Sequence, residues 1–160
     1  MKLIVLHIFI LFSCKAFGQN IILPDGEFMD TTSNHDKACK DYNWYYYQVG
    51  GKYPQSSTTL LKEAQQFLLK KNESYSDSGY ITFRFKINCE GKMVQKVQVL
   101  QTDEKYSSYH FDKNLVNELY TFIKTLDRWK TVKTKEGEPL LYKAFITFKI
   151  KNGKVVNIIP

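Results

Sequence analysis

Apolar and polar residues alternate most regularly in the middle of the chain. Every second residue over 81–87 is apolar, and the residues between them are polar or charged. A period of two is typical of a strand with one buried face. The turn residues at 88–91 and the apolar positions of 93–100 predict a second strand that completes a hairpin. Its alternation slips between Val94 and Val97, which favours a β-bulge there.

Two amphipathic helices are predicted, one before and one after this hairpin. Apolar residues recur at helical spacing over 60–68, and the hydroxyl residues at 57–59 can cap this helix. A longer apolar stripe runs over 111–126, with Ser107 and Ser108 as candidate caps.

A second hairpin is predicted at the end of the chain. Residues 140–150 alternate, Asn152-Gly153 is a type I′ turn signal, and 155–159 return as a strand. The order helix, then β-β-α-β-β, predicts an α+β fold over 57–160. We expect two layers, with an antiparallel sheet and the helices packed on one face of it.

Residues 19–56 are irregular by pattern and rich in tyrosine. The segment contains turn residues such as Gly50-Gly51, and an aromatic cluster lies at 42–47. Exposed aromatic faces would make it a platform for sugars or peptides. The alternative, which we favour, is a strand or loop that packs onto the domain behind it.

Residues 1–18 are typical of a secretory signal peptide. A ten-residue apolar run follows Lys2 and is too short for a comfortable membrane span. Small residues before Gln19 suit cleavage there. Cys14 lies in a sequence similar to a bacterial lipobox, so it is a candidate for lipidation. Either route exports the protein, and a membrane contact would come only through a lipid anchor or an uncleaved signal.

Composition and charge limit the classes of partner that we expect. The chain of 160 residues suggests one domain, and its net charge of +7 raises the question of nucleic acid. The lysines are spread along the whole chain, and only Arg84 and Arg128 could make bidentate contacts to bases. We therefore expect no nucleic acid partner.

Export changes the interpretation of the cysteines. An oxidising compartment would permit a disulfide between Cys39 and Cys89, tying the N-terminal segment to the turn after the first strand. Two unpaired thiols are the alternative. No known ligand spacing relates these cysteines to His35 or His110, so we expect no metal site.

The sequence contains no recognisable catalytic set, phosphate loop or cofactor motif. We therefore expect a protein that is not an enzyme and uses no cofactor. A small open sheet has unpaired backbone groups on its outer strands, and such an edge can accept an extended peptide as an added strand. The same edge would permit a homodimer by strand pairing.

The segment over about 75–160 resembles the C-terminal domain of TonB. Residues 80–88 and 91–100 look like that domain's first hairpin, whose second strand reads G-x-x-V-x-x-V-x-V. The helix ending at Trp129-Lys130 is similar to the family's helix before a W-K-P signature, and 137–140 resembles its G-x-P-V strand start. The matching positions are Gly91, Val94, Val97, Trp129, Lys130, Gly137 and Pro139.

This resemblance implies a periplasmic or envelope-attached module of a Gram-negative, Bacteroidetes-like bacterium. Its partner would be a peptide segment of an outer-membrane transport protein, bound by strand addition. The chain departs from the family where Thr131 replaces the usual proline, and where no long Pro-rich spacer precedes the domain. The alternative is a shortened energy transducer that keeps an uncleaved N-terminal anchor.

Overall fold

The computed structural model describes residues 27–29 and 39–159. The expected signal peptide, Cys14, Gln19 and His35 lie outside these residues. In chain order the elements are β1 (Glu27–Met29), β2 (Lys40–Tyr45), α2 (Tyr46–Val49), α3 (Ser57–Leu69), β3 (Gly79–Ile87), β4 (Met93–Thr102), α4 (Lys113–Lys124), β5 (Val132–Lys133), β6 (Pro139–Lys151) and β7 (Lys154–Ile159).

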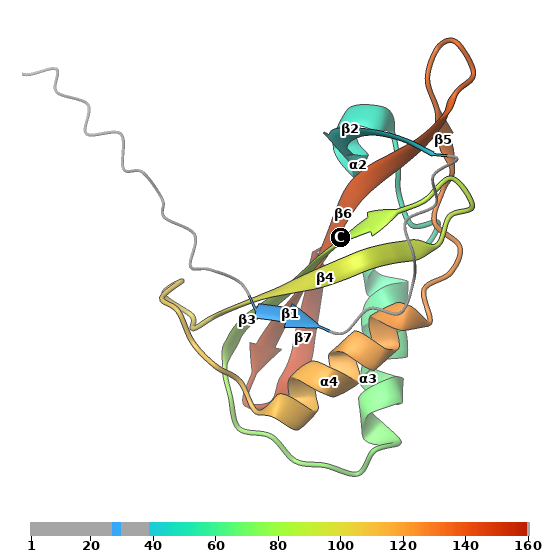
Figure 1. The fold of residues 1–160 in the computed structure, drawn as a ribbon. Helices are drawn as coiled ribbons and strands as arrows, with labels where there is room; N and C mark the ends of the chain where they lie inside the picture. The colour runs from blue at the N-terminus through green and yellow to red at the C-terminus, as the bar shows by residue number, and fades with distance from the viewer. Residues whose placement is uncertain (1–26, 30–38, 160) are drawn as a thin grey trace, which may run out of the picture.

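One sheet contains every strand of the described residues, in the order β1-β4-β3-β6-β2 (Figure 1). The long strand β6 pairs with β3 on one side and with β7 and β2 on the other. The short β5 also pairs with β6, opposite Leu140. All of these pairs are antiparallel except β2–β6, which is parallel. The predicted α+β class with an antiparallel sheet is confirmed, and the parallel β2–β6 pair is an addition that the sequence pattern did not predict.

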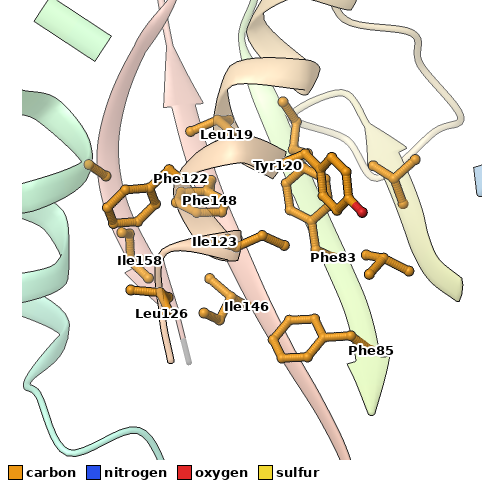
Figure 2. Packing of buried hydrophobic residues seen from close by; sticks show 14 of the residues in the cluster. Phe83, Phe85, Leu119, Tyr120, Phe122, Ile123, Leu126, Ile146, Phe148 and Ile158 are labelled. Carbon is orange, nitrogen blue, oxygen red and sulfur yellow. The ribbon is translucent and has the colours of Figure 1, made fainter. Parts of the chain in front are cut away.

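The core lies between the sheet and the two long helices. The side chains that β3 and β6 direct inward are buried, as their alternation predicts. Figure 2 shows residues of α4 above them, where the Phe122 and Phe148 rings meet edge to face at 6.2 Å. Phe67 of α3 contacts the same Phe122 ring at 5.8 Å, and α3 also packs along β7.

Local sequence explains where the helices begin. The Ser56 side chain accepts a hydrogen bond from the Thr59 N–H at the start of α3. The expected caps at 57–59 are therefore wrong, because the helix begins at Ser57 and the preceding Ser56 caps it. For α4 the cap is Asp112, whose carboxylate accepts from the Asn114 N–H. The expected caps at Ser107 and Ser108 are therefore wrong, because the carboxylate of Asp112 serves that role closer to the apolar stripe.

The predicted bulge in β4 is present. Arg84 lies opposite Gln98 but Lys86 lies opposite Val94, so β4 advances four residues while β3 advances two. This places Val97 in the main core and Val94 in a separate small cluster with Leu141. A bulge of this kind bends and twists the strand.

The N-terminal segment is more regular than its sequence predicts. Residues 19–56 were expected to be irregular, but β1, β2 and α2 lie within them and two of these are strands of the sheet. The Cys39–Cys89 disulfide is present and joins the start of β2 to the β3–β4 turn. Pairing with distant strands and this crosslink create structure that local periodicity does not encode.

Candidate strand-binding edges and an aromatic cleft

β4 forms one border of the sheet, and the protein's own β1 lies on its outer side. Glu27 is opposite Val99 and Met29 is opposite Val97 in an antiparallel register. Met29 packs against the main core, while the Phe28 side chain is 63% exposed. This border therefore holds an extended segment through backbone pairing, with alternate side chains inside and outside.

β1 is held by few contacts. It covers three residues of a ten-residue strand. The Glu27 carboxylate lies 3.3 Å from His110 Nδ1, but both side chains are well exposed, and such pairs contribute little to stability. A cleft of about 360 Å³ runs between β1 and the start of α4, with Phe111 and Val116 among its lining residues. His110 lies in the loop before α4 rather than in the helix.

The opposite border of the sheet is also partly covered. β2 and β7 occupy the far side of β6, so β2 forms the outer edge beside the start of β6 and β7 forms it beside the end of β6. No strand pairs with that edge among the described residues. The Gln65 side chain of α3 donates to the Val155 carbonyl at 2.8 Å, and α3 runs along this strand. The open outer strands expected from the sequence are therefore partly occupied by the chain's own segments: β1 pairs with β4 at one border, and α3 hydrogen-bonds to β7 at the other.

Of the residues that carry the family resemblance, the structure brings Gly91 and Trp129 together, whereas Val97 lies in the main core and Val94 in a separate small cluster. A Cβ atom at Gly91 would lie 2.4 Å from the Trp129 carbonyl oxygen, and its φ of +77° also favours glycine. The Trp129 ring is buried against Phe85 and Tyr53. The turn at 88–91 thus needs a glycine because the chain after α4 passes directly over it.

The signature residues Lys130, Gly137 and Pro139 lie along the segment that joins α4 to β6. The Lys130 N–H donates to the Lys52 carbonyl, and its own carbonyl accepts from the buried Tyr142 hydroxyl at 2.8 Å. Gly137 has a φ of +88° in the turn between β5 and β6, and Pro139 begins β6. The segment between α4 and β6 also contains the short strand β5, which the sequence does not predict because two residues carry no periodicity.

The aromatic cluster at 42–47 belongs to β2 and α2, which pack onto the rest of the domain. Its backbone pairs with β6, as the favoured interpretation requires. Its side chains nevertheless remain open, with Tyr42 49% and Trp44 39% exposed. Both line a cleft of about 520 Å³ whose far wall is the β5–β6 turn. Segments that are distant in the sequence form this cleft, so the local sequence pattern does not predict it.

Buried titratable groups lie elsewhere. The Glu118 side chain is largely buried 3.9 Å from Lys71 Nζ, and burial followed by the nearby charge of Glu73 raises its pKa. The Tyr75 hydroxyl donates to Glu73 at 2.7 Å. Within the described ranges, no three acidic, histidine or cysteine side chains gather as a metal site would require.

The part of the chain that the structure describes contains no helix with the length and apolar character needed to cross a bilayer. Comparison with protein-family models, curated proteins and solved structures finds no match to this chain.

Proposed function

We propose that the chain is a non-enzymatic binding module of the bacterial cell envelope, similar to the TonB C-terminal domain. It takes a short extended segment of an outer-membrane transport protein as an added strand. One observation carries this proposal: β1 lies on the β4 edge as an added strand supplied by the chain itself.

The β4 edge suits a longer strand than β1. A bound segment is held by main-chain hydrogen bonds, while pockets for alternate side chains supply specificity. Met29 marks one such inward position and the cleft beside Phe111 offers space for others. A partner that pairs with more of β4 than the three residues of β1 gains backbone hydrogen bonds, and this favours exchange of β1 for the partner.

The disulfide supports an envelope location. Such bonds persist in oxidising compartments such as the periplasm and are rare in the cytosol. Cys39 is buried beside Val94 and Leu141, so the crosslink belongs to the folded structure rather than to its periphery.

Two matched variants of the full chain test the proposal. Phe28→Pro with Met29→Pro removes two adjacent N–H groups, one of which must face β4, and so releases the edge. Phe28→Cys with Gln98→Cys places a disulfide across a directly opposed pair and so locks β1 in place. Each variant is used to capture proteins from an envelope extract of the source bacterium.

We expect the released variant to enrich outer-membrane transport proteins over the locked variant, with the unaltered chain between them. Phe28→Ala is the control for loss of the exposed ring and should behave like the unaltered chain. Equal recovery by the released and locked variants, or recovery of no transport protein, would overturn the proposal.

A further inference from the structure

The structure contains a second candidate binding surface, the cleft beside β2, which is separate from the β4 edge. We propose that this cleft binds a polysaccharide through stacking of a pyranose ring on the outer face of Trp44, whose other face is covered by Tyr42. The inference does not depend on the proposed function.

A bulge in β2 turns these two rings out of the sheet. Asp41 is opposite Leu141 and Tyr45 is opposite Lys143, so β2 advances four residues while β6 advances two. Between them Asn43 has a φ of +59°, a left-handed conformation that asparagine tolerates better than most residues. Bulges re-aim side chains and are common beside binding sites.

The bulge is held by a defined set of contacts. The Asp41 carboxylate accepts a hydrogen bond from the Asn43 N–H at 2.9 Å and forms an ion pair with Lys86 on β3. The disulfide at Cys39 fixes the chain immediately before β2. The aromatic pair therefore stands on a preorganised support, which lowers the entropy lost on binding.

The Tyr42 and Trp44 rings stack on each other. Their centroids are 4.9 Å apart with an interplanar angle of 27°, so each ring covers one face of the other. The Tyr42 hydroxyl also reaches Glu138 at 3.4 Å. Proline-rich peptides dock in grooves lined by aromatic side chains, but these stacked rings leave no slot between them. A flat ligand that stacks on the outer face of Trp44, the face that Tyr42 leaves uncovered, fits better.

The rest of the cleft supplies polar partners. Lys133, Thr134, Lys135 and Glu136 of the β5–β6 turn form one wall, and Gln48 of α2 contributes an amide. Leu140 lies at the apolar floor, where β2 and β5 flank β6 from opposite sides (Figure 1). A sugar ring presents C–H groups on its face and hydroxyls around its rim, and this division matches an apolar floor with a polar wall. The volume of about 520 Å³ is within the usual range for ligand pockets.

Tryptophan fluorescence provides a direct test, because the chain has two tryptophans and Trp129 is buried. The full chain is titrated with hexasaccharides of glucose, galactose, mannose, N-acetylglucosamine and a uronic acid, at up to millimolar concentration. Binding is measured in parallel by calorimetry. We expect at least one sugar to bind and to shift the emission of Trp44 to shorter wavelength.

The variants separate stacking from other effects. Trp44→Ala should weaken binding roughly three- to tenfold, whereas Trp44→Phe should bind by calorimetry without the fluorescence change. Tyr47→Ala removes an aromatic side chain that is 62% exposed but does not line the cleft, and should bind normally. The proposal is overturned if no sugar binds, if Trp44→Ala binds as well as the unaltered chain, or if decaproline binds in place of the sugars.

Discussion

Loss of the Cys39–Cys89 disulfide should cost a large part of the stability of this domain. The two cysteines are 50 residues apart in sequence, and a crosslink over that length restricts the unfolded chain. The chain-entropy model gives about 4 kcal/mol for a loop of this size. Cys39 is also buried against Val94 and Leu141, so its replacement removes packing in addition to the crosslink. The double variant Cys39→Ala and Cys89→Ala should therefore lose about 4 kcal/mol or slightly more.

Urea unfolding followed by circular dichroism measures this loss. With a slope of roughly 2 kcal/mol per molar, the midpoint should fall by about 2 M. The reduced unaltered chain is the matched control, because it lacks the crosslink but keeps both sulfur atoms. It should lose nearly as much as the double variant. A loss below about 1 kcal/mol in both would show that the crosslink does not restrict the unfolded chain as the entropy argument requires.

Three further predictions test the packing of the core and the effect of burial on a carboxylate. Gly91→Ala should destabilise the fold by more than about 2 kcal/mol in thermal unfolding, because the added Cβ would meet the Trp129 carbonyl. Gly137→Ala is the control: its Cβ has open space, so it should lose only about 1 kcal/mol for its positive φ. Equal losses in the two variants would refute the clash at Gly91. Phe83→Ala should lose about 3–5 kcal/mol in urea, since its ring is fully buried, and a loss under 1 kcal/mol would contradict that burial. Burial raises the folded-state pKa of Glu118, so its contribution to stability is favourable below its ordinary pKa and is lost as pH rises through the raised value. Glu118→Gln should therefore stabilise the fold at pH 7 in urea unfolding, and this gain should shrink as pH falls, whereas a loss of stability at pH 7 would refute the sign.

Segments with strong local periodicity were predictable from sequence. The alternation over 81–87 gave β3 because one face of that strand contacts α4 and the other does not. The apolar stripe over 111–126 likewise predicted α4, although the helix itself is shorter, and Asn152-Gly153 predicted the β6–β7 turn. In these segments the local pattern and the tertiary contacts agree.

The N-terminal strands were not predictable in this way. β2 is mostly exposed and interrupted by a bulge at Asn43, so it has no period of two. It exists because it pairs with β6 and because Cys39 is tied to Cys89. β1 has three residues and depends wholly on β4. Both candidate sites use these strands, and the sequence indicated only the aromatic residues of the second site, not the strand that carries them.

Nuclear magnetic resonance on the full chain tests most directly whether the β4 edge accepts a strand from another molecule. The variant with Phe28→Pro and Met29→Pro is mixed with a synthetic peptide of residues 24–30 at millimolar concentration. We expect amide shifts and slower hydrogen exchange at Val97–Val99, and no change in the variant locked by Phe28→Cys with Gln98→Cys. Shifts at another place, or equal shifts in the locked variant, would contradict strand addition at this edge.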